Sequence, residues 1–150
     1  MSKKKSESRI KSGVYEKNKI QLADIITSIK KNHVISDAGA IFTFTGIVRN
    51  TSLSGKEVKA MEIDAYEKMA NQSIIQICQK MKKRKGIIDV VLIHFRGKFN
   101  LSEDLVHVVV ASAHRQEGLE TLSDTIEKYK KSIEVWKKEL FKDGSSTWIH

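Results

Sequence analysis

The 150-residue sequence contains no proline and a single cysteine, Cys78. One cysteine excludes an internal disulfide and a cysteine-based metal cluster. Without proline, the eight glycines must mark most turns. The sequence also lacks an apolar run of the roughly 20 residues that a membrane helix needs, and its start, MSKKKSESRI, lacks the apolar segment of a signal peptide. We therefore expect a cytoplasmic protein without a membrane partner.

What the sequence has in excess is positive charge. It contains 27 basic and 18 acidic residues, for a formal charge of +9, and 40% of its residues are hydrophobic. Such a field attracts nucleic acid, an acidic protein or a phosphorylated metabolite. The basic residues concentrate before residue 20 and in KMKKRKG at 80–86, where a solubilising role is the commoner one. We predict a disordered basic arm over residues 1–12 and a single domain over 13–150.

Periodicity indicates the fold class. Apolar residues at helical spacing predict helices over 22–31, 69–81 and 115–133, and alternation predicts strands over 39–50, 58–66, 87–95, 104–112, 135–141 and 145–150. Cys78 falls on the apolar stripe of the second helix. In the third helix the predicted buried face consists of Leu119, Leu122, Ile126, Tyr129 and Ile133. Helices that alternate with strand pairs predict an α+β domain with a mostly antiparallel sheet and packed helices.

The predicted strands are expected to pair with their neighbours in the chain. The first two would form an antiparallel pair joined by a long loop around Gly55, and the next two a pair around Gly97. The dipeptide Asp143–Gly144 predicts a hairpin between the last two strands.

Two lysines close to each other in the chain are candidates for chemistry. Lys130 lies near the end of the third predicted helix and Lys137 near the start of a predicted strand, so a turn between them can bring both ammonium groups together. Two positive charges lower each other's pKa, which makes a lysine useful for proton transfer or nucleophilic attack. Lysines of basic proteins are mostly solvated, so this pair alone does not define a site.

Other polar residues lie where predicted strands end. Arg49 ends one strand, and His114 and Arg115 open the third helix, where free N–H groups, an imidazole and a guanidinium can bind phosphate. His94 and His107 lie inside strands and are interpreted as core or edge residues. The spacing of His, Asp and Glu indicates no metal site, and neither a Walker loop nor a dinucleotide motif is present. We expect no metal and no cofactor.

Four stretches carry a resemblance to a known family. GAIFTFTGIVRN, AYEKMA, ASAHRQEGLE and VWKKELFKDGSSTWI are similar, in that order and spacing, to the large catalytic subunit of molybdopterin synthase. The resemblance runs from about Asp37 to Ile149, and before it only a short strand–helix lead-in is similar. It implies a sulfurtransferase of molybdenum cofactor biosynthesis that adds two sulfurs to cyclic pyranopterin monophosphate (precursor Z), giving the dithiolene of molybdopterin.

The same resemblance implies partners and site residues. The large subunit of that family forms a homodimer, and a small ubiquitin-like subunit with a C-terminal thiocarboxylate docks at each end, giving a heterotetramer. The resemblance makes Lys130 and Lys137 catalytic, and it brings His114 and Arg115 to the pocket of the opposite subunit. The implied substrate-binding residues are Ile47, Val48, Arg49, His114, Arg115, Lys130, Lys137, Lys138 and Glu139. Their positive charges suit a pocket that holds a cyclic phosphate and a thiocarboxylate together.

Three positions depart from the pattern of the family. Glu134 replaces a proline and adds a charge near the expected pocket mouth, Phe95 replaces an arginine after His94, and Ser102 replaces a glycine in a turn. These changes affect loop shapes and the docking surface more than the reaction.

Two rival functions remain open. An RNA-binding module would use the basic surface, and RGKFNL at 96–101 faintly resembles an RNA-binding motif, but we place this stretch in a connection between strands. A non-catalytic scaffold would be expected to lose some of the residues Arg49, His114, Lys130 and Lys137, and all four are present.

Overall fold

The computed structural model describes residues 9–149. Within that range the elements are β1 (Gly13–Glu16), α1 (Leu22–Ile29), a 3₁₀ turn (Ile35–Asp37), β2 (Ala40–Ile47), β3 (Val58–Ala65), α2 (Glu67–Lys82), β4 (Ile87–Asn100), β5 (Asp104–Ser112), α3 (Arg115–Ser132), β6 (Val135–Phe141) and β7 (Ser146–Ile149). The strands form one sheet in the order β2-β5-β4-β3-β6-β7, and β1 pairs with β4. All pairs are antiparallel except β1–β4. The predicted α+β class is confirmed.

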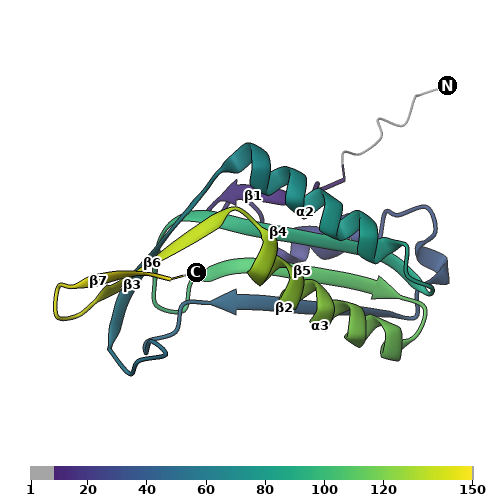
Figure 1. Ribbon diagram of the computed structural model, residues 1–150. Coiled ribbons are helices and arrows are strands. Elements are labelled where there is room, and N and C mark those ends of the chain that lie inside the picture. The colour runs from purple at the N-terminus through teal and green to yellow at the C-terminus, as the bar shows by residue number, and fades with distance from the viewer. Residues whose placement is uncertain (1–8, 150) are drawn as a thin grey trace.

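The long strand β4 joins two parts of this sheet. One of its edges pairs with β5, and the other pairs first with β1, at residues 93–96, and then with β3, at residues 97–100. The change of partner from β1 to β3 occurs at Gly97, whose φ of 128° is a backbone conformation that residues other than glycine rarely adopt. Beyond it, β3, β6 and β7 extend away from the body of the molecule (Figure 1).

The predicted pairing of β2 with β3 is wrong. β2 pairs with β5, and β3 pairs with β4 and β6. The loop between β2 and β3 closes on itself through an isolated bridge from Thr51 to Glu57 and hydrogen bonds around it. Alternation identifies strands but does not identify their partners, and a loop of this length lets β3 leave the neighbourhood of β2. The predicted β4–β5 pair and the β6–β7 hairpin at Asp143–Gly144 are confirmed.

β4 is also longer than predicted. Gly97 lies inside the strand, and the turn to β5 comes at residues 101–103, where Ser102 has a φ of 69°. Thus residues 96–100 belong to β4, and placing RGKFNL in a connection was wrong. Strand β1, which the predicted order left out, adds its parallel pairing to the same strand.

Helices α2 and α3 lie side by side across the sheet (Figure 1). The predicted stripe of α2, with Cys78, is buried. In α3 the buried residues are Gly118, Thr121, Thr125 and Tyr129, whereas Leu119 is 51% exposed, contrary to prediction. A Cβ on Gly118 would come within 2.4 Å of the ring of Phe42. The helix therefore approaches β2 along its smallest residues, which turns Leu119 outward.

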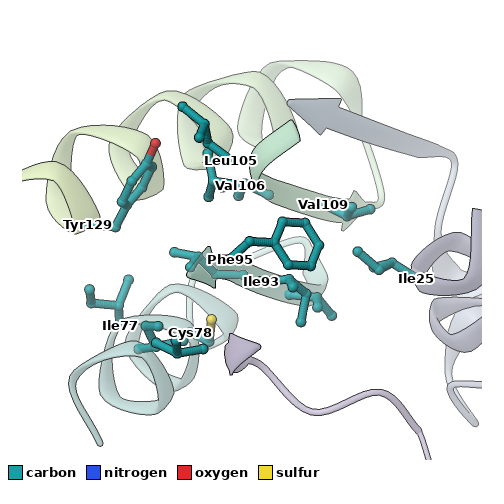
Figure 2. Packing of buried hydrophobic residues seen from close by; sticks show 14 of the residues in the cluster. Ile25, Ile77, Cys78, Ile93, Phe95, Leu105, Val106, Val109 and Tyr129 are labelled. Carbon is teal, nitrogen blue, oxygen red and sulfur yellow. The ribbon is translucent and has the colours of Figure 1, made fainter. Parts of the chain in front are cut away.

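The core lies on both faces of β4 and β5. Figure 2 shows Ile25 of α1, Cys78 of α2 and Tyr129 of α3 around residues of these two strands. His94 and His107 are buried in the same strands, as predicted for core residues. Because His107 is paired with Ile93, the neighbour of His94, the two histidines point to opposite faces of the sheet.

The beginning of the described chain packs against the domain. Arg9 forms an ion pair with the buried Asp89, and the backbone of Ile10 donates to Ser28 Oγ. Residues 1–8 of the predicted arm lie outside the described residues. The rest of that arm, residues 9–12, contacts the domain. Across residues 9–149, no helix combines the length and the apolar character required to cross a membrane.

Candidate active site

An open cavity of about 810 Å³ lies between the end of β2, the end of α3 and the strands β6 and β7. Five of the predicted site residues line it, namely Ile47, Arg49, Lys130, Lys137 and Glu139. Apolar side chains, among them Phe44, Met61 and Leu105, form another part of its wall. The cavity therefore combines an apolar surface with a group of cationic side chains.

The junction between α3 and β6 brings the two lysines together. The helix ends at Ser132, and the backbone of Val135 bonds to the carbonyl of Ile133 at 2.9 Å as the chain turns into β6. Pairing with β3 then fixes Lys137 opposite Ile63. Lys130, in the last turn of the helix, and Lys137 line the same cavity, as the sequence predicted.

Lys137 is the electrostatically perturbed member of the pair. Burial lowers its pKa, and the positive charge of Lys130 lowers it further. Within residues 9–149 no carboxylate lies at ion-pair distance from its ammonium group, although Glu139 lines the same cavity. A lysine with a lowered pKa can give up and take back a proton near neutral pH more easily than a solvated one.

The end of β2 presents alternate side chains to the cavity. Ile47 and Arg49 line it, and Arg49 Nε donates to the carbonyl of Thr51 at 3.0 Å. The side chain of Val48 is only 2% exposed and packs in the core, as alternation along an extended chain requires. The side chain of Val48 thus does not line the cavity, and the role of this residue in substrate binding stays a prediction.

Lys138 lies outside the cavity. Its ammonium group is 5.5 Å from the centre of the Trp148 ring on the neighbouring strand β7. It therefore faces the opposite side of β6 from Lys137, and its predicted contact with substrate has no support within one chain. The predicted charge of Glu134 at the pocket mouth also lies elsewhere, since its carboxylate accepts a hydrogen bond of 2.7 Å from Ser73 on α2.

His114 and Arg115 lie at the other end of α3. His114 precedes the first residue of the helix, its side chain is 82% exposed, and its Nδ1 is 3.4 Å from Glu117 Oε1. Lys130 follows Arg115 by fifteen positions in the helix, a distance of about 22 Å at 1.5 Å per residue. One chain therefore does not bring this pair to the lysine cavity, and only a second copy could supply it there.

Sequence reasoning missed two residues of the site. His94 and Tyr129 were assigned to the core, yet both line an inner cavity of about 210 Å³ beside Lys130 and Lys137. Burial and the charge of Lys137 lower the pKa of His94 to about 4, and burial raises the pKa of Tyr129 to about 12. Nothing in an alternating strand distinguishes a core histidine from one that faces a cavity.

The geometry defines a class of protein, an α+β domain in which a desolvated lysine and an exposed one line the same cavity beside an apolar wall. Residues 15–132 match the model of the MoaE protein family, and the chain belongs to this family. The matched segment includes Arg49, His114, Arg115 and Lys130 and ends before β6 and Lys137.

Curated relatives extend the match. The chain is 38% identical over 112 residues to the molybdopterin synthase catalytic subunit of Pyricularia oryzae, covering 75% of this chain and 61% of that protein. It is 35% identical over 125 residues to the subunit of that name in Thermoplasma volcanium, covering 83% of this chain and 88% of that protein. The chain thus spans less than two thirds of the fungal relative and most of the archaeal one.

Solved structures agree on the fold. Molybdopterin synthase from Staphylococcus aureus superposes with a TM-score of 0.78 at 27% identity, covering 93% of this chain and 96% of that chain. A chain from the complex of subunits 1 and 2 of the molybdopterin-converting factor of Helicobacter pylori superposes with a TM-score of 0.70 at 18% identity, covering 91% and 88%. The second likeness shows the fold alone. None of these matches favours RNA binding.

Proposed function

We propose that this chain is the catalytic subunit of a molybdopterin synthase. It would transfer sulfur from the C-terminal thiocarboxylate of a small ubiquitin-like subunit to precursor Z and so form the dithiolene of molybdopterin. The observation that carries the proposal is the shared cavity of Lys130 and Lys137, in which the pKa of Lys137 is lowered, in a member of the MoaE family. The names of the curated relatives support it.

The cavity suits the two reactants. Its volume of about 810 Å³ lies within the roughly 300–1,000 Å³ typical of small-molecule sites. The apolar residues Phe44, Met61 and Leu105 offer a surface for a pterin ring system, and Arg49 supplies a guanidinium for a phosphate. The ammonium groups of Lys130 and Lys137 would then hold the narrow, anionic end of the partner's tail.

The two lysines have different tasks in this proposal. Lys137, whose pKa is lowered, exchanges protons with the reacting groups, because an acid–base group works best when its pKa approaches the working pH. Lys130 contributes a positive charge that stabilises the thiocarboxylate and, after transfer, the carboxylate of the tail. The reaction proposed in this form needs no resident cofactor.

The proposed assembly contains two copies of this chain and two of the small partner. His114 and Arg115, remote from the lysine cavity of their own chain, would complete the cavity of the second copy. The complex of subunits 1 and 2 in the Helicobacter pylori protein supports a partner of this kind. The cytoplasmic location stays a prediction from the sequence.

The test is reconstitution. The purified chain is incubated with precursor Z and a thiocarboxylated small subunit, and molybdopterin is detected by mass spectrometry. A small subunit that ends in an ordinary carboxylate is the matched control, because it can dock but carries no sulfur. Molybdopterin formed only with the thiocarboxylate supports the proposal. A folded complex that binds both reactants and yields none refutes it.

A further inference from the structure

His94, in β4, has a buried nitrogen without a partner. Its side chain is 1% exposed, and its Nδ1 lies 3.0 Å from the carbonyl oxygen of Phe95. Within the described part of the chain, Nε2 has no hydrogen-bond partner. A buried polar atom without a hydrogen-bond partner lowers the stability of the fold, so the position of Nε2 beside the lysine cavity needs a physical reason.

The hydrogen bond to Phe95 fixes the tautomer of the ring. A carbonyl oxygen can only accept, so Nδ1 carries the hydrogen and Nε2 carries the lone pair. Burial, the larger cause, and the charge of Lys137 lower the pKa of His94 to about 4, which keeps the ring neutral at physiological pH. Nε2 is therefore a hydrogen-bond acceptor to which no group of the described chain donates.

Among the donors that line the inner cavity, Lys137 is the one whose charge acts on the His94 ring. Its ammonium group has three N–H donors, and in the described chain no carboxylate lies at ion-pair distance from it. Tyr129 packs edge-on against the imidazole, with ring centres 5.9 Å apart, and closes the helix side. The other titratable and charged groups that line the two cavities around Lys137 are Arg49, Lys56, His94, Tyr129, Lys130 and Glu139.

We propose that His94 is a positioning residue for Lys137, whose ammonium group turns within the inner cavity to donate a hydrogen bond to His94 Nε2 that the described structure does not contain. This bond holds the lysine against the inner wall and leaves its remaining N–H groups for the reactants in the main cavity. It also stabilises the protonated lysine against desolvation and the repulsion from Lys130. The inference rests on the proposed function for its catalytic meaning, but the hydrogen bond itself does not.

The first test measures the pKa of Lys137 without substrate or partner. The pH dependence of labelling by an amine-reactive reagent is read at the peptide containing Lys137 by mass spectrometry. His94→Phe removes the acceptor and keeps a ring, whereas His94→Gln keeps an acceptor oxygen near the position of Nε2. His107→Phe is the matched control, because His107 is as buried as His94 but faces the other side of the sheet.

His94→Phe is expected to lower the pKa of Lys137 by about one unit, because the bond that it removes stabilises the charged lysine more than the neutral amine. Labelling at a pH below that pKa should then accelerate about tenfold. His94→Gln and His107→Phe are expected to label as the wild type does. Equal pKa values of Lys137 in the Phe and Gln variants of His94 overturn the proposal.

A second measurement remains decisive if His94→Phe does not fold. The ¹⁵N resonance of His94 Nε2 is compared between the wild type and Lys137→Met, which removes the donor. A clear shift supports the hydrogen bond, and an unchanged resonance overturns it. If reconstitution gives no molybdopterin while labelling and resonance respond as expected, the proposed function fails and the hydrogen bond stands.

Discussion

Replacing Lys137 by methionine should stabilise the fold while it abolishes most activity. In the structure the charge of Lys137 is opposed by burial and by Lys130, with no carboxylate at ion-pair distance among residues 9–149. Each unit by which folding lowers the pKa of a lysine costs about 1.4 kcal/mol of stability at neutral pH. Methionine fills a similar volume and removes this cost, so the free energy of unfolding at pH 7 should not fall.

The sign of the pH dependence makes this prediction specific. Because the pKa of Lys137 is lower in the folded state, the unfolded chain holds the proton more tightly between the folded pKa and 10.5. Wild-type stability should therefore rise relative to Lys137→Met as the pH increases through that interval. Urea unfolding at pH 7 and near pH 10 measures the difference, which should be larger at pH 7.

The activity of the same variant should fall by roughly a hundredfold or more, as loss of an acid–base group does. Lys137→Arg keeps the charge but not the lowered pKa, so it should hold the partner's tail and transfer sulfur poorly. Lys138→Met is the control, because Lys138 lies over Trp148 outside the cavity, and it should cost far less activity. A Lys137→Met variant that is clearly less stable than the wild type, or an arginine variant with full activity, would refute the reasoning.

Three further predictions concern packing, assembly and charge. Gly118→Ala should destabilise the fold by about 1–3 kcal/mol or more in urea, because the new methyl group meets Phe42, whereas the exposed Leu119→Ala should change stability by no more than about 0.5 kcal/mol. If two chains share each cavity, mixing inactive Arg115→Ala with inactive Lys137→Ala should restore about a quarter of wild-type activity, since half of the randomly formed dimers then hold one intact cavity; no recovery after verified subunit exchange would contradict sharing. Nucleic acid should bind weakly and with a steep salt dependence, as the charge of +9 implies, and tight sequence-selective RNA binding at physiological salt would revive the rival function.

Much of this structure follows from periodicity alone. The helices, most strands and the final hairpin could be predicted, because buried faces repeat every 3.6 or every 2 residues. The partners of β2 and β3 could not, since β2 pairs with β5 through a non-local contact that no local pattern encodes. The face of α3 was misjudged at Leu119, because a close approach at Gly118 outweighs side-chain hydrophobicity.

The candidate site, like the fold, could be predicted from the sequence only in part. Lys130 and Lys137 were predicted to meet because a turn separates them in the chain, and they line one cavity. Val48 was named with its neighbours, and strand alternation then turned its side chain inward. The exposed imidazole of His114 and the buried imidazole of His94 look alike in a sequence, and only the fold distinguishes them.

The passage of β4 from the body of the sheet to its extension has a mechanical consequence. Lys130 is carried by a helix packed on the body, whereas Lys137 is carried by β6, which follows that helix after two residues and pairs with β3, the strand that pairs with residues 97–100 of β4. The two ammonium groups are thus placed both by the short junction of residues 133–134 and by the pairing of β6 with β3, which joins β4 from Gly97 onward, where the backbone favours glycine. The cavity thus lies between a helix and a strand whose relative position is held by the backbone. A residue with a side chain at 97 would strain this φ and disturb the β3–β4 pairing that supports β6, although its Cβ would contact neither Lys130 nor Lys137.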